Sequence, residues 1–88
     1  MIVEIEKSFE KAYFKVQDKI LARHILAIIE DVSNANALEN IKEIKKMKGY
    51  RNFYRIKSGN YRIGISIYKK TVTFITFDHR KDIYKKFP

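Results

Sequence analysis

A strict two-residue alternation runs through residues 61–68 of this chain. Apolar side chains stand at every second position and polar or small residues stand between them, in the order Tyr61, Arg62, Ile63, Gly64, Ile65, Ser66, Ile67 and Tyr68. Because successive side chains of a strand point to opposite faces, the pattern predicts a strand with one buried face and one open face. A one-residue shift in register would bury Arg62, so hydrophobic burial fixes the register.

Two further strands are expected beside this one. Phe53–Lys57 alternates in the same way and is joined to it by Ser58-Gly59-Asn60, a tight turn in which Gly and Asn supply positive φ. Thr71–Phe77 follows after a turn at Lys69-Lys70. The three segments predict an antiparallel meander. Its apolar face is expected to carry Tyr54, Ile56, Ile63, Ile65 and Ile67.

The first part of the chain shows a strand signature followed by helical spacing. Ile2–Glu6 is rich in β-branched residues, as strands are. Ser8 is a candidate N-cap for a first helix, and Asp18 is a candidate N-cap for a second. The second helix has one apolar stripe suited to core packing, formed by Leu21, Ile25, Ile28 and Val32. The short break between the helices predicts an antiparallel helical hairpin.

The whole chain is expected to form one α+β domain over residues 1–88. We predict a short N-terminal strand, an antiparallel helical hairpin packed on a twisted antiparallel β-meander, and a short C-terminal helix at Arg80–Phe87 with Asp78 as its candidate cap. The N-terminus has no apolar run of signal-peptide length, and Ile20–Val32 is too short to span a bilayer. A cytoplasmic protein without membrane contact is therefore expected.

Positive charge is concentrated in the second half of the chain. Residues 41–88 contain 14 Lys and Arg and 3 acidic residues, whereas residues 1–40 contain 5 and 7. This asymmetry predicts a polyanionic partner such as a nucleic acid. Arg55 and Lys57 alternate with apolar residues in their strand, and Arg62 does so in the next. All three are therefore expected on the open face of the sheet.

These cations suggest a phosphate-binding site. The candidate residues are Arg55, Lys57, Arg62, His79, Arg80 and Tyr84. Arg can grip two phosphate oxygens and Lys adds a mobile charge, while Tyr84 could stack on an unpaired base. Gly64 is expected to leave a groove beside Arg62. For RNA cleavage by the neighbouring 2′-hydroxyl, the cations would stabilise the added negative charge and His79 could transfer a proton.

Simpler roles for the same residues remain open. The open-face cations could serve solubility alone, and His79 could hydrogen-bond the backbone only. Tyr84 could instead pack in the core against the helical hairpin. His24 stands between Leu21 and Ile25 and is expected to be a residue at the flank of the apolar stripe or a buried packing residue. With two distant histidines, few acids and no cysteine, neither a metal site nor a cofactor is predicted.

Four motifs follow one another in the second half of the chain. They are Lys48-Gly49, Tyr54-Arg55-Ile56-Lys57, Gly59-Asn60-Tyr61-Arg62-Ile63 and His79-Arg80-Lys81-Asp82-Ile83-Tyr84. Together they resemble the RelE/ParE superfamily of bacterial toxins, in its RelE-type branch, and the likeness covers essentially the whole chain. The resemblance implies the toxin of a type II toxin–antitoxin system that cleaves mRNA in the ribosomal decoding site by 2′-hydroxyl attack, without a metal. Its implied partners are mRNA, the 70S ribosome and a cognate antitoxin, with which it would form a hetero-oligomer.

The resemblance also implies roles for individual residues. The family's catalytic basic pair falls on Arg55 and Lys57, and its phosphate-gripping Arg falls on Arg62. The Arg proposed as acid or charge stabiliser falls on Arg80, and the stacking Tyr falls on Tyr84.

Two positions bear on the comparison with the family pattern. Arg55 stands where the family has Lys, and Arg stays charged. Residue 79 is His, where some relatives have Lys and others have a His thought to transfer protons. Lys57 or His79 is therefore expected to move protons. Further basic residues are expected to attract RNA, with an effect that fades as salt rises. They are Lys45, Lys46, Lys48, Arg51 and Lys81.

Two other functions stay open at this point. Because the same superfamily includes gyrase poisons, one alternative is a ParE-like DNA gyrase inhibitor that performs no chemistry. It predicts DNA-damage signalling without mRNA cleavage, and indifference to Arg62→Ala combined with Arg80→Ala. The other alternative is a non-catalytic nucleic-acid-binding module, which predicts salt-sensitive binding and no growth arrest.

Overall fold

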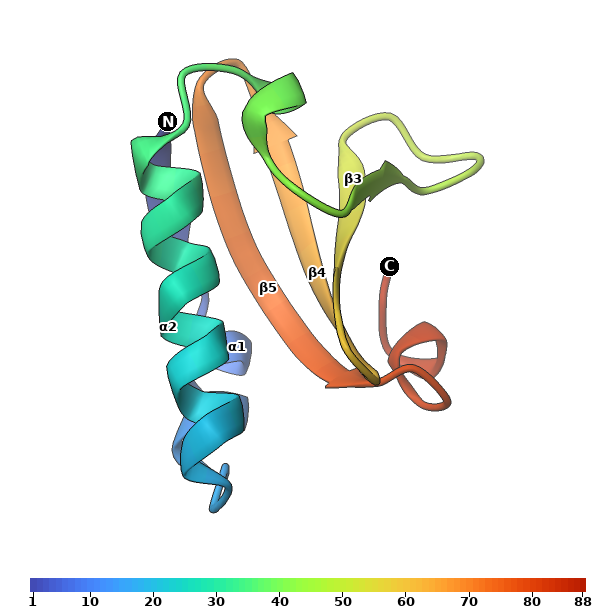
Figure 1. Ribbon diagram of the computed structural model, residues 1–88. Helices are drawn as coiled ribbons and strands as arrows, with labels where there is room; N and C mark the ends of the chain where they lie inside the picture. Colours follow the sequence, from blue (N-terminus) through green and yellow to red (C-terminus); the bar gives the residue numbers. More distant parts are fainter.

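The computed structural model describes all 88 residues and shows a five-stranded mixed sheet with two helices on one face (Figure 1). The strand order is β1-β5-β4-β3-β2. The elements are β1 (Ile2–Ile5), α1 (Lys7–Phe14), α2 (Lys19–Asn34), the 3-10 helix η1 (Leu38–Asn40), β2 (Ile44–Lys46), β3 (Phe53–Ser58), β4 (Tyr61–Tyr68), β5 (Thr71–His79) and the 3-10 helix η2 (Ile83–Lys85). The predicted α+β fold is confirmed. None of the helices is long and apolar enough to cross a membrane.

The predicted antiparallel meander is formed by β3, β4 and β5. Ile56 pairs with Ile63 across β3 and β4, and both side chains are buried on the face that the helices cover. The turn between these strands contains Gly59 at φ +58°, a conformation that glycine adopts without steric cost. Between β4 and β5 the register shifts by one residue, because Gly64 pairs with Thr76 whereas Ile65 pairs with Phe74. Ile75 is thus an extra residue in β5.

Two strands extend the meander at its edges. The predicted N-terminal strand is β1, which runs parallel to β5 and pairs Val3 with Val72. The other, β2, was missed in the sequence analysis because three residues, two of them lysines, give no alternating pattern. It runs antiparallel to β3 and places Lys45 directly opposite Arg55.

The helices supply the other half of the core. In α2 the predicted stripe is confirmed, since Ile25 and Val32 are buried and the two remaining members pack against the core. Asp18 is the N-cap, as predicted, and its Oδ1 accepts hydrogen bonds from the backbone N–H groups of Ile20 (2.9 Å) and Leu21 (3.2 Å). These bonds satisfy donors that the first turn would leave without partners.

The predicted cap of the first helix is wrong. Helix α1 begins at Lys7, and the residue in the N-cap position is Glu6, which makes no side-chain capping bond. Ser8 lies inside the helix, and its hydroxyl donates to the carbonyl oxygen of Ile75. Ser8 therefore ties α1 to β5 at the extra residue of that strand.

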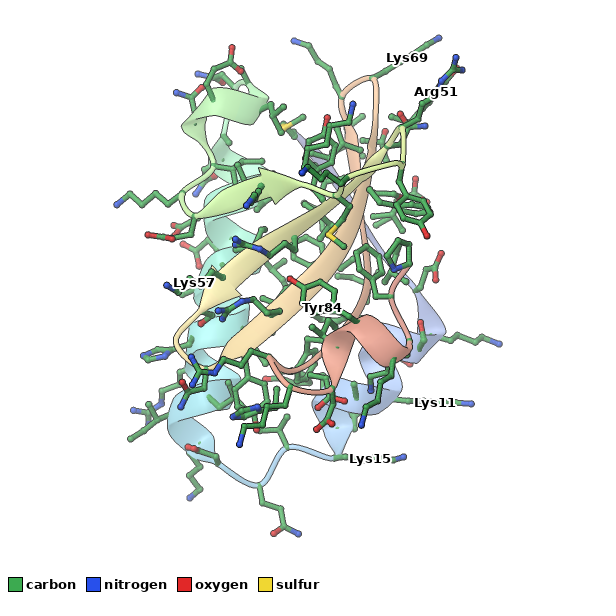
Figure 2. All side chains as sticks on the ribbon, turned by 90° about the vertical axis from the view of Figure 1, so that its right-hand side faces the viewer. Lys11, Lys15, Arg51, Lys57, Lys69 and Tyr84 are labelled. Atoms are coloured by element: carbon green, nitrogen blue, oxygen red, sulfur yellow. The ribbon has the colours of Figure 1, made fainter.

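The C-terminal segment, residues 80–88, lies across the open face, which we define as the face of the sheet opposite α1 and α2 (Figures 1 and 2). The predicted C-terminal helix is present only in part: residues 80–82 form a turn, and the helical part of the predicted range Arg80–Phe87 is the 3-10 helix η2. The predicted cap is wrong, because the residue in the N-cap position is Asp82 and it makes no side-chain capping bond. Ile83 and Phe87 are 0% and 2% exposed. A Cβ atom on Gly64 would lie 2.6 Å from the Phe87 ring. The predicted groove at Gly64 is therefore filled by Phe87.

Candidate nucleic-acid interface

Three of the predicted site residues come together on the open face. Lys57 pairs directly with Arg62, and Arg55 pairs with Gly64 two residues further along the same strands. The pair between them, Ile56 with Ile63, faces the core, so these cations face away from the helices. The C-terminal segment covers Gly64, so the accessible cations border it on the side of β2 and β3.

The side chain of Arg62 is held by its own hairpin. Its Nη1 donates to the carbonyl oxygens of Gly59 and Tyr61, each at 2.9 Å. The Nε and Nη2 groups make no hydrogen bond to the protein, and a guanidinium offers five donors in all. Arg62 is thus fixed in place while donors suited to a phosphate stay free.

Arg80 is brought to the same end of the sheet. Its backbone N–H donates to the carbonyl oxygen of Asn60 at 2.7 Å, which ties the chain after β5 to the turn that precedes Arg62. The Arg80 residue is exposed. The structure therefore places Arg80 at the hairpin end where Lys57 and Arg62 pair.

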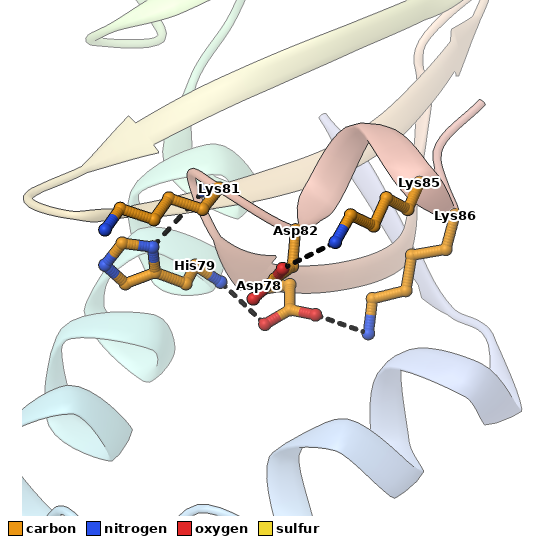
Figure 3. Close-up of polar contacts among 6 residues, drawn as sticks. All are labelled: Asp78, His79, Lys81, Asp82, Lys85 and Lys86. Carbon is orange, nitrogen blue, oxygen red and sulfur yellow. Dashed lines mark hydrogen bonds and ion pairs between the residues drawn. The ribbon is translucent and has the colours of Figure 1, made fainter.

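His79 is separated from these cations. It pairs with Tyr61, whose side chain packs against the core, so the His79 ring lies on the helix side of the sheet. The two rings meet edge-on, with centroids 5.8 Å apart. The Nδ1 atom of His79 accepts a hydrogen bond from the backbone N–H of Lys81 at 3.2 Å (Figure 3). The structure thus gives His79 a local bonding role and does not bring it together with Arg62.

Tyr84 stands over the open face, on η2. Its residue is 54% exposed, so the alternative that it packs against the helical hairpin is wrong. In Figure 2 it lies in front of the sheet, on the side away from α2. Tyr84 borders a hollow of about 270 Å³ whose other lining residues are Lys45, Lys46, Met47, Lys48 and Arg55. An exposed aromatic ring and four cations therefore surround one space.

The basic residues expected to attract RNA fall into three places. Lys45 and Lys46 of β2, together with Lys48 in the turn that follows, line the Tyr84 hollow. Arg51 lies in the loop between β2 and β3, beyond that hollow. Lys81 lies in the turn after β5. Sequence reasoning missed that the first three belong beside Tyr84, because only the β2–β3 pairing brings them there.

Both ion pairs involve a lysine of the C-terminal segment. Lys85 pairs with Asp82 at 3.4 Å, and Lys86 pairs with Asp78 at 2.9 Å (Figure 3). Neither pair involves Arg55, Lys57, Arg62 or Arg80. The cations of the open face therefore have no carboxylate partner within the chain and can bind an external anion. No group of three or more His, Cys, Asp or Glu side chains is placed to hold a metal ion.

The carboxylate of Asp78 is stabilised in its charged form. Partial burial raises its pKa, but the hydrogen bonds from the Lys86 ammonium and the His79 backbone N–H lower it, as do the charges of Lys86 and His79. The net result is a pKa below the ordinary value of 3.8. Asp78 thus anchors the C-terminal segment through Lys86, and this segment carries Tyr84.

We expect Asp78→Asn to lower the free energy of unfolding by about 1 kcal/mol at pH 7. Because the folded pKa lies below the unfolded one, the contribution of Asp78 is complete above about pH 5 and disappears as the pH falls through the folded pKa. Urea unfolding from pH 7 to pH 2 should show the two stability curves converging in acid. Asp82→Asn, which removes an exposed pair, should change stability by less than about 0.5 kcal/mol. A constant gap between wild type and Asp78→Asn at all pH values would contradict this assignment.

The comparisons with known proteins now decide the family. Residues 3–84 match the family model described as ParE toxin of type II toxin-antitoxin system, parDE. The chain is also 47% identical over 89 aligned residues to the toxin RelE3 of Methanocaldococcus jannaschii, with 100% of both chains covered. The chain belongs to the RelE/ParE superfamily of type II toxin–antitoxin toxins. The family assignment made from the four motifs is therefore confirmed.

Solved structures of this superfamily share the fold. A RelB–RelE antitoxin–toxin complex from Methanococcus jannaschii contains a chain that aligns with a TM-score of 0.80 and 44% identity, over 97% of this chain and 99% of that one. The isolated E. coli RelE toxin aligns with a TM-score of 0.66 at 16% identity, over 97% and 92% of the two chains. The second likeness concerns the fold alone. A RelE-like arrangement of strands and helices is thus established for this toxin.

Proposed function

We propose that this toxin is a ribosome-dependent mRNA endonuclease that cleaves in the decoding site through the RNA 2′-hydroxyl, without a metal. The observation that carries the proposal is the set of open-face cations without carboxylate partners, bordered by the exposed ring of Tyr84. Such a surface suits a single RNA strand, because the cations can bind its phosphates and the ring can stack on a base.

In the proposed reaction, O2′ bonds to phosphorus and O5′ leaves, which yields a 2′,3′-cyclic phosphate and a 5′-hydroxyl. Arg62, with its free donors, and Arg55 hold the phosphate and stabilise its added negative charge. Lys57 lies on the same face as Arg62 and is our candidate for accepting the 2′-hydroxyl proton, in preference to His79. Arg80 supports charge on the leaving oxygen, and Tyr84 stacks on the base.

The remaining partners follow from this role. The ribosome would position the mRNA, which supplies the alignment that a small site lacks and places the toxin in the cytoplasm. Lys45, Lys46, Lys48, Arg51 and Lys81 would attract the RNA. Because the Methanococcus jannaschii structure is a complex of toxin and antitoxin, we propose a cognate antitoxin that forms a hetero-oligomer with this chain and offsets its positive charge.

Primer extension on a defined mRNA bound to programmed ribosomes tests the proposal. We expect wild type to cut at the decoding site only when ribosomes are present, and Arg62→Ala to cut about 10²–10³-fold more slowly. Arg23→Ala removes the same charge from α2, on the other side of the sheet, and should cut at the wild-type rate. Circular dichroism should confirm that both variants fold.

Other outcomes select other functions. Intact mRNA together with growth arrest and DNA-damage signalling would overturn the nuclease and favour gyrase inhibition, which the ParE description of the family model keeps in view. Intact mRNA without growth arrest would leave a nucleic-acid-binding module.

A further inference from the structure

We propose that the loop between β2 and β3 forms a second nucleotide-binding subsite, in which Tyr50 stacks on another base of the RNA strand that reaches Tyr84. The inference rests on the proposed action on RNA and extends it from one contact to two. The loop consists of residues 47–52, and Lys46 at the end of β2 lies directly before it. This proposed role differs from nonspecific attraction of RNA by positive charge, because the loop also supplies an aromatic ring in a hollow of its own.

The first observation is the hollow itself. It has a volume of about 440 Å³ and is lined by Lys46, Met47, Lys48, Gly49, Tyr50 and Arg51. Three of its six lining residues are cations, and no acidic residue occurs anywhere between Ile44 and Phe77. A negatively charged group such as a phosphate therefore meets attraction without nearby repulsion.

The second observation is the way Tyr50 is held. Its ring contacts the Phe53 ring edge-on, with centroids 5.9 Å apart, and its backbone N–H donates to the carbonyl oxygen of Met47 at 3.4 Å. Even so, Tyr50 is 47% exposed. Beside it, Gly49 has φ +81°, and a Cβ there would meet nothing within 4 Å. A supported ring with open space beside it can stack on any base, since every base has a π-face.

The third observation is that the two hollows are adjacent and share part of their lining. Lys46, Met47 and Lys48 line both of them. In addition, the Phe53 ring that supports Tyr50 meets the Phe87 ring edge-on at 5.5 Å, and Phe87 belongs to the segment that carries Tyr84. Figure 2 shows Arg51 and Tyr84 on the same side of the molecule. One strand of unpaired RNA can therefore cross from one aromatic platform to the other along a row of lysines.

Binding of a short RNA in the absence of ribosomes tests this subsite. The probe is a fluorescein-labelled decanucleotide with 2′-deoxy sugars throughout its centre, which prevents cleavage. We expect Tyr50→Leu to raise its Kd about 5- to 150-fold in fluorescence anisotropy, because stacking is lost while apolar bulk remains. Tyr50→Phe should bind as wild type does. Phe14→Ala removes an exposed aromatic residue from α1, between Lys11 and Lys15, and should also bind as wild type does.

The same assay identifies the strand. If one strand crosses both aromatic rings, Tyr84→Leu also raises the Kd of the decanucleotide. A dinucleotide is too short to reach both rings, so its Kd should respond to only one of the two substitutions. An unchanged Kd for Tyr50→Leu would overturn the inference and leave the nuclease proposal standing. Sensitivity to Tyr84→Leu alone, with weaker ribosome binding by Tyr50→Leu, would assign the loop to ribosomal RNA and also overturn it. Tyr50-dependent binding with uncut mRNA would retain the subsite and overturn the nuclease.

Discussion

We expect Phe87→Ala to lower the free energy of unfolding by about 3–5 kcal/mol, the usual cost of truncating a buried aromatic residue. The ring lies on Gly64 and meets Phe53 edge-on, and it is the buried anchor that follows η2. For a small domain with about 5–15 kcal/mol of total stability, the loss is large. Urea unfolding should report it directly. Cleavage should fall as well, because Tyr84 loses its support.

Gly64, the other residue in this contact, provides a second and more specific test. Gly64→Ala places a Cβ against the Phe87 ring and should cost about 1–3 kcal/mol by overpacking. In the double variant the clash is absent, so the combined loss should be smaller than the sum of the two single losses by at least about 0.5 kcal/mol. Phe14→Ala, at a residue 75% exposed, should change stability by less than about 0.5 kcal/mol. Strict additivity of the first two changes would contradict the packing described here.

Removing Arg55 and Arg62 together should slow mRNA cleavage on the order of 10⁴-fold, since each preorganised donor contributes about 10²–10³. The two residues lie on adjacent strands of the open face and form no ion pair, so stability should change little apart from the hydrogen bonds of Arg62 to its hairpin. Single-turnover cleavage on programmed ribosomes measures the effect. Urea unfolding separates it from a loss of fold.

A charge-matched variant provides the control. Lys19→Ala combined with Arg23→Ala removes two cations from α2, on the helix side of the sheet, and should leave cleavage unchanged. Arg55→Lys keeps a cation where the family pattern has Lys and should retain most activity. If the α2 variant loses as much activity as the open-face variant, then net charge rather than this surface governs cleavage.

Local sequence patterns were sufficient for the centre of the fold. The alternation from Tyr61 onward requires that Ile63 and Ile65 be buried together, and they are. Asp18 caps α2 because a carboxylate just before an apolar stripe has free N–H groups within reach. β2 could not be predicted in this way, since its place depends on pairing with β3 and not on its own three residues.

The sequence predicted the face of the sheet correctly for those site residues whose strands keep a regular alternation of side chains. Arg55, Lys57 and Arg62 lie on the open face because β3 and β4 pair without interruption. β5 contains one extra residue at Ile75, which inverts the alternation beyond it. The His79 side chain therefore lies on the helix side of the sheet. Without the extra residue, uninterrupted alternation from the buried Phe74 would place it on the open face.

The position of the C-terminal segment also could not be predicted from local sequence patterns. Arg80–Phe87 contains apolar residues at spacings that suit a helix. The deciding contact is the Phe87 ring on Gly64, which joins residues 23 positions apart in the sequence. Gly64 offers the ring a flat backbone surface, and burial of that ring ends the helical path after one turn of η2.

The parallel pairing of β1 with β5 has a consequence for synthesis of the toxin. Ile2 pairs with Thr71 and Ile5 pairs with Phe74, so the first strand made must wait for the last. Until β5 has left the ribosome, β1 has no neighbour in the sheet and α1 has no surface to cover. Such long sequence separation between partners slows folding, because the loop must close before the contacts form. The five-stranded sheet can therefore be completed only after the last strand of the chain has been made.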